Sequence, residues 1–188
     1  VGTFEIRQFA KAGILADLGP LMDGPENVDT SGWPATLRAA GQVDGKQYWL
    51  PFNVSVPVMY LNEAQLKEAG LQGPPETWDQ FFDYARRLTK RNASGNVIRR
   101  GLSLWDITWP LVSAIWSEGG EVCDREYAKI TLDDPATIEV MRKFQALMKE
   151  GAADMPPQAT GGQRNAFVHG NAAMILDSPA PMRDFFEY

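Results

Sequence analysis

The segment Val56-Pro57-Val58-Met59-Tyr60-Leu61-Asn62 carries the clearest indication of the fold. Its residues 58–61 form a continuous run of apolar, β-branched and aromatic side chains, which is typical of a strand buried on both faces. Asn62 then suits the N-cap of a short helix that ends at Gly70. A buried strand that leads directly into a helix favours an α/β protein.

Upstream, Asp44-Gly45 separates two short runs with apolar flanks. Asp-Gly between such runs is a strong sequence signal for a β-hairpin, because both turn positions need a positive φ. We therefore expect a hairpin here, with a strand at residues 48–50. Before it, glycine and proline punctuation predicts three short helices, at residues 4–12, 14–18 and 34–40.

Downstream, helical and strand patterns alternate. Thr77 and Gln80 have capping-box spacing and predict a helix to about Lys90. The further predictions are a strand at 97–104, a helix from Pro110 through Trp116, a helix from 135 to about 150, a short helix at 163–169 and a strand at 172–176. We expect the strands at 58–61 and 173–176 to share one sheet.

Composition excludes several classes of function. The 188 residues carry 18 basic and 24 acidic side chains, a net charge of −6, and no basic stripe, which argues against nucleic-acid binding. One cysteine, Cys123, and one histidine, His169, argue against disulfides, multi-cysteine zinc sites and histidine-rich metal sites. No apolar run approaches the roughly 20 residues of a membrane-spanning helix. We expect no metal and no cofactor.

Residues 44–62, DGKQYWLPFNVSVPVMYLN, resemble the DGK-Y-LPF-x-S-x-PV-YYN segment of the extracytoplasmic solute-binding proteins of carbohydrate ABC importers. Four further stretches resemble that family's landmarks in the family's order: residues 66–71, 74–78, 116–120 and 167–174. Within the family, the sequence is most similar to the glycerol-3-phosphate-binding branch.

The resemblance implies an α/β, periplasmic-binding-protein-like fold of two lobes, of which this chain would hold a part. Residues 1–55 would belong to lobe one, 56–178 to lobe two, and 179–188 would begin the return into lobe one. It implies a non-enzymatic protein of the periplasm or cell exterior, with a lipid anchor allowed in the full-length form. Such a protein captures a sugar, polyol or glycerol-phosphate in the inter-lobe cleft and delivers it to the permease subunits of the importer.

Five residues are candidate ligand contacts: Asn53, Ser55, Trp105, Trp109 and Ser178. Tryptophan rings stack on the C–H faces of sugars, and the predicted helix start at Pro110 would place both tryptophans in a loop, with free N–H groups facing an anion. Alternatively, both rings belong to the core, and Ser55 bonds only local backbone. Ser178 resembles the family serine, although Pro179 and Pro181 remove backbone donors. Trp116 is expected in the core.

Two alternatives concern the site as a whole. A carbohydrate-active enzyme would use acidic residues near Trp105, drawn from Asp106, Glu118, Glu121 and Asp124, although the sequence does not fix their distances. Ser55-Val56-Pro57 and Ser178-Pro179 are expected to be extended crossing segments that bring the two serines together near Trp105 or Trp109. If they are instead unrelated surface turns, the serines lie far apart.

Overall fold

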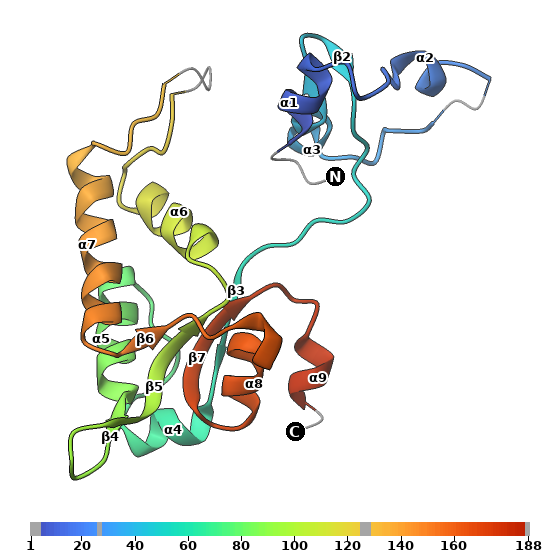
Figure 1. The fold of residues 1–188 in the computed structure, drawn as a ribbon. Coiled ribbons are helices and arrows are strands. Elements are labelled where there is room, and N and C mark those ends of the chain that lie inside the picture. Colours follow the sequence, from blue (N-terminus) through green and yellow to red (C-terminus); the bar gives the residue numbers. More distant parts are fainter. Residues whose placement is uncertain (1–4, 26–27, 125–128, 187–188) are drawn as a thin grey trace. The chain divides into compact units, whose positions relative to one another are not determined.

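The computed structural model describes residues 5–25, 28–124 and 129–186. It divides into two compact units, Val1–Val54 and Ser55–Tyr188 (Figure 1). No helix in the described parts of the chain is long and apolar enough to cross a membrane.

The described residues of the first unit form three short helices and one hairpin. They are α1 (Ile6–Lys11), α2 (Gly19–Met22), α3 (Ala35–Ala40), β1 (Gln42–Val43) and β2 (Lys46–Gln47). The predicted hairpin is confirmed, since Asp44 and Gly45 have φ values of 50° and 77° between the paired strands.

Two predictions in this unit are wrong. Residues 48–50 form no strand, because the Gln47 side chain donates to the Trp49 carbonyl and diverts it from strand pairing. Residues 14–18 form no helix. The Asp17 carboxylate instead accepts from the Gly19 amide, 3.0 Å away, in an Asx turn, and α2 begins at Gly19.

The second unit is built on a sheet of five strands: β3 (Val58–Leu61), β4 (Lys90–Arg91), β5 (Val97–Leu104), β6 (Ala153–Asp154) and β7 (Ala172–Asp177). The order is β3-β7-β5-β4, with β6 also paired to β5. β5 runs parallel to β6 and β7, whereas β3 runs antiparallel to β7. Tyr60 lies opposite Ile175, which confirms that the predicted strands share a sheet. β3 is the terminal strand of this order, and its residues are half-buried. The prediction that this strand is buried on both faces is therefore wrong.

Six helices accompany this sheet in the described chain: α4 (Glu63–Glu68), α5 (Trp78–Leu88), α6 (Thr108–Ser117), α7 (Pro135–Lys149), α8 (Gly162–Val168) and α9 (Met182–Phe186), with a 3₁₀ turn at Gln158–Thr160. The predicted caps at Asn62 and Thr77 are confirmed, and Asp134 caps α7 in the same way. Asn62, Thr77 and Asp134 each accept a hydrogen bond from a backbone N–H of the first turn that follows.

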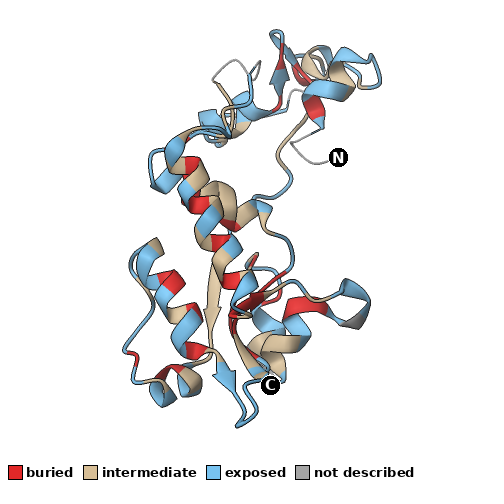
Figure 2. Cartoon of the chain, turned by 60° about the vertical axis from the view of Figure 1, so that its left-hand side comes forward, coloured by how far each residue is buried: buried red, intermediate tan, exposed pale blue. Residues whose placement is uncertain are grey.

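The core of this unit lies between α5, α7 and the sheet, with α8 and α9 to the right of the sheet in Figure 1. Phe82 and Phe144 meet edge to face, with ring centroids 5.0 Å apart, and Trp78 and Phe81 complete the aromatic cluster. Buried residues mark the inward faces of helices and the central strands in Figure 2. The tightly packed sheet provides a rigid support for the loops at its edges.

Candidate ligand-binding site

Three chain segments meet at one edge of the sheet. β5 and β7 are parallel, so their carboxyl ends, Leu104 and Asp177, lie at the same edge. β3 is antiparallel to β7, and Ser55, three residues before β3 begins, therefore approaches that edge as well. Ligands of open α/β sheets bind outside the carboxyl ends of parallel strands, so this edge is the expected place for a site.

A cavity of about 130 Å³, here called the strand-end hollow, lies at this edge. Its lining residues are Ser55, Trp105, Asp106, Trp109, Pro110, Leu176, Asp177 and Ser178. The predicted proximity of the two serines to Trp105 or Trp109 is therefore confirmed, with both tryptophans present, and the alternative of two unrelated surface turns is wrong. Contact of these residues with a ligand stays a prediction. Asn53 belongs to the first unit, and its ligand contact likewise stays a prediction.

The two tryptophans differ in setting. Trp105 follows β5 directly and is 55% exposed. Trp109 is half-buried in the first turn of α6, which begins at Thr108 and not at Pro110 as predicted. The Asp106 carboxylate accepts a hydrogen bond from the Thr108 amide two residues on, and this Asx turn leads the chain into the helix.

This helix start differs from the expected anion-binding N-terminus. A carboxylate already occupies it, and Pro110 has no N–H to offer. Negative charge at a helix N-terminus satisfies the helix dipole, so a second anion would meet repulsion from Asp106.

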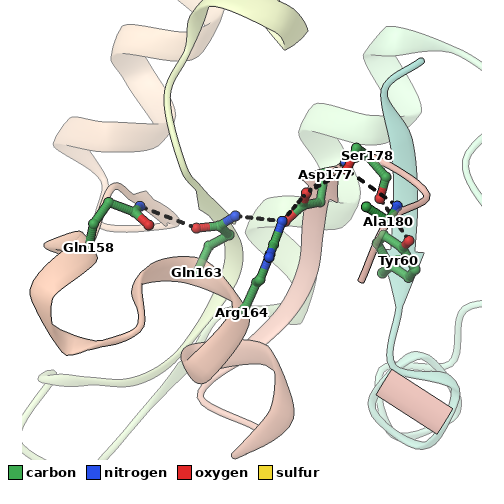
Figure 3. Close-up of polar contacts among 7 residues, drawn as sticks. All are labelled: Tyr60, Gln158, Gln163, Arg164, Asp177, Ser178 and Ala180. Carbon is green, nitrogen blue, oxygen red and sulfur yellow. Dashed lines mark hydrogen bonds and ion pairs between the residues drawn. The ribbon is translucent and has the colours of Figure 1, made fainter. Parts of the chain in front are cut away.

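Asp177 is a lining residue that sequence reasoning missed. It is the last residue of β7 and is only 4% exposed. The Arg164 guanidinium donates to both carboxylate oxygens, at 2.7 and 2.9 Å, and Gln163 Nε2 donates at 2.9 Å (Figure 3). Burial alone would raise the pKa of Asp177, but the bonds from Arg164 and the Ser178 amide outweigh it and hold that pKa below its ordinary value.

Ser178 is held in a turn. Its hydroxyl accepts from the Ala180 amide at 3.3 Å, and the Tyr60 hydroxyl donates to its carbonyl at 2.9 Å (Figure 3). The Met182 amide then bonds the Pro179 carbonyl as the chain enters α9. The expectation of an extended segment at Ser178-Pro179 is therefore wrong, because these local bonds favour a turn.

Trp116 lies outside this site and outside the core. It is 59% exposed and lines a separate cavity of about 420 Å³ together with residues 119–124. The expectation of a core role is wrong, because α6 turns Ala114 and Ile115 inward and leaves the next residue on the outer face.

The four acidic residues considered for a catalytic pair lie in different places. Asp106 lines the strand-end hollow, whereas Glu121 and Asp124 line the cavity beside Trp116, and Glu118 lines neither. Within the described residues, no group of three or more His, Cys, Asp or Glu side chains could hold a metal ion.

An open α/β sheet whose strand ends carry a hollow lined by indole rings and hydroxyls is typical of the class of proteins that bind small molecules. The chain belongs to the family of bacterial extracellular solute-binding proteins, whose family model matches residues 1–186. Its fold class, a part of the two-lobe α/β fold, agrees with this membership.

Individual relatives support the same class. The chain is 29% identical over 181 residues to the diacetylchitobiose binding protein DasA of Streptomyces coelicolor. This alignment covers 94% of the chain and 40% of DasA. Its structure is similar to that of UgpB of Mycobacterium tuberculosis in complex with glycerophosphocholine, with a TM-score of 0.78 and 26% identity. The match covers 97% of the chain and 45% of UgpB. It also shares the fold of a Listeria monocytogenes ABC substrate-binding protein in complex with cycloalternan, with a TM-score of 0.80 and 22% identity. That match covers 96% of the chain and 46% of the Listeria protein. The chain thus spans less than half the length of these proteins.

Proposed function

We propose that the strand-end hollow is a wall of the solute site in the binding component of an ABC importer, and that the solute is a neutral carbohydrate or polyol. The observation that supports this most is the convergence of Trp105, Trp109, Ser55 and Ser178 at the strand ends of a chain from the solute-binding family. Indole rings pack against sugar C–H faces, and hydroxyls bond the sugar hydroxyls. The protein captures its solute without making or breaking a bond.

The mechanism that we propose is differential affinity between open and closed lobes. We assign residues 1–55 to the first lobe and residues 56–178 to the second; residues 179–188, which group here with the second unit, would begin the return to the first lobe in the full-length protein. A solute that contacts both lobes stabilises the closed state, and the permease recognises that state.

The charges of the hollow favour a neutral solute over glycerol-phosphate. Its charged lining residues are Asp106 and Asp177, and the latter is already paired with Arg164. None of the described lining residues is a lysine or an arginine. A phosphate would therefore approach an uncompensated carboxylate at Asp106 without a cation in this wall.

Isothermal titration of the full-length gene product tests the proposal. Diacetylchitobiose, maltose, mannobiose and D-mannitol serve as neutral probes, and sn-glycerol-3-phosphate serves as the anionic probe. We expect binding of at least one neutral probe and weaker binding of the anion. Binding of glycerol-3-phosphate in preference to every neutral probe would contradict the charge argument. Release of cleavage products from the disaccharides would contradict a transport role.

Trp109→Ala tests the site itself. It should weaken the bound neutral probe roughly tenfold to a hundredfold, about 1.4–2.7 kcal/mol, because the stacking surface is lost. Trp116→Ala is the matched control on the same helix and should leave affinity unchanged. If Trp109→Ala lowers thermal stability as strongly as it lowers affinity, Trp109 is a core residue and not a ligand contact.

A further inference from the structure

The carboxylate of Asp177 is buried, charged and fully engaged. Its Oδ2 accepts from Gln163 Nε2 and Arg164 Nε, and its Oδ1 accepts from Arg164 Nη2 and, at 2.7 Å, from the Ser178 amide (Figure 3). A carboxylate has about four lone-pair sites, so these donors satisfy it. Asp177 lines the strand-end hollow without a free acceptor to offer a solute.

We propose that Asp177 is a positioning residue, which, with Arg164 as its counter-ion, holds the Ser178 turn in the geometry that binds solute. This inference rests on the function proposed above and adds to it the residues that fix the wall. Asp177 acts through Ser178 and does not itself contact the solute.

The Ser178 turn is fixed from three elements. The Asp177 carboxylate at the end of β7 binds the Ser178 amide, and the Tyr60 hydroxyl on β3 binds the Ser178 carbonyl. The third element, α8, supplies Arg164, whose two-pronged ion pair sets the orientation of the carboxylate. A change at α8 therefore reaches the hollow through one side chain.

The ion pair also determines how the turn responds to pH. Two charged or titratable groups act directly on Asp177, namely Arg164 on α8 and Tyr60 on β3. A third group, Asp184 on α9, acts on it through Arg164. Asp106 shares the hollow. Without Arg164, burial would dominate and raise the pKa of Asp177. The wild-type carboxylate thus stays ionised further into the acid range than the carboxylate of an Arg164→Gln variant.

The experiment compares Asp177→Asn, Arg164→Gln and Arg164→Lys in the full-length gene product, titrated with the four neutral probes. Arg142→Gln, on the exposed face of α7, is the control. We expect Asp177→Asn and Arg164→Gln to weaken every bound probe tenfold or more at pH 7. Arg164→Lys should recover part of the loss, because it restores the charge without the fork, and the control should bind as wild type does. The affinity of Arg164→Gln should also fall at a higher pH than that of wild type.

Hydrogen exchange of the ligand-free proteins provides a second readout. The amides of Ser178, Ala180 and Met182 should exchange faster in Asp177→Asn and Arg164→Gln, whereas amides of α7 stay protected. Unchanged exchange in this segment would overturn the proposal, as would full affinity in both variants. Faster exchange throughout the second unit would also overturn it, because Asp177 would then stabilise the whole unit and not the Ser178 turn in particular. If no neutral probe binds wild type, the proposed function fails, and exchange at 178–182 still decides whether Asp177 holds the turn.

Discussion

Replacing Asp106 with asparagine should make the strand-end hollow more tolerant of anions. Asparagine, like aspartate, accepts hydrogen bonds from the backbone two residues on, so its side-chain oxygen can still accept from the Thr108 amide. The start of α6, and with it Trp109, should therefore keep its place. The substitution removes one negative charge from the lining of the hollow and changes little else.

The size of the effect follows from Coulomb's law. Two unit charges about 5 Å apart repel by about 1 kcal/mol in water and about 3 kcal/mol at an effective dielectric constant of 20. Asp106 is exposed, so the lower part of this interval applies, about 1–2 kcal/mol. The affinity for sn-glycerol-3-phosphate should rise about 5-fold to 30-fold.

Titration of wild type and Asp106→Asn at low and high salt measures this gain. The gain should shrink at high salt, because exposed charges are screened. Asp106→Ala is the structural control: it gives the same charge change but also loses the hydrogen bond from the Thr108 amide, at a cost of about 0.5–1.5 kcal/mol in unfolding free energy. An unchanged affinity for the anion in Asp106→Asn would refute the argument that this carboxylate repels phosphate.

Three predictions concern stability and are measured by urea or thermal unfolding. Phe144→Ala should lower the unfolding free energy by about 3–5 kcal/mol, because the buried ring leaves a cavity among three other rings, and Phe144→Leu should lower it less; equal losses would argue against a packed cluster. Trp116→Ala should change the unfolding free energy by less than about 1 kcal/mol, since the ring is largely exposed. A loss as large as that of Phe144→Ala would show that Trp116 is a core residue. Lys90 and Arg99 lower the pKa of Glu68 to about 2 from its ordinary value of 4.5, so Glu68→Gln should be less stable than wild type at pH 7. That difference should disappear as the pH falls from about 4.5 to 2, and a difference independent of pH would exclude the ion pairs as its cause.

Local signals in the sequence predicted much of the fold. The caps at Asn62, Thr77 and Asp134 and the turn at Asp44-Gly45 each depend on residues within four positions, so tertiary packing had little to override. The outward placement of Trp116 could not be found in this way. α6 is apolar around most of its circumference, so its periodicity does not identify the buried face, and packing against α7 decides it.

The candidate site shows the same division. The resemblance to a family placed Ser55, Trp105, Trp109 and Ser178 together, which no local pattern could do, because strand pairing over long sequence distances assembles them. Asp177 was missed because its partner lies on another element. One signal was available: a carboxylate that ends a buried apolar strand is costly unless a cation pairs with it, and this requirement leads to a search for an arginine.

The hydrogen bond between Tyr60 and Ser178 joins residues that lie 118 positions apart in the chain. A ribosome that adds about 5–20 residues per second would make the second partner roughly 6–24 seconds after the first. During that interval β3 exists without β7, and its unpaired backbone groups are open to pairing with other chains. Early termination of translation before Ala172 therefore removes Leu176, Asp177 and Ser178 from the strand-end hollow and leaves β3 without its partner strand β7.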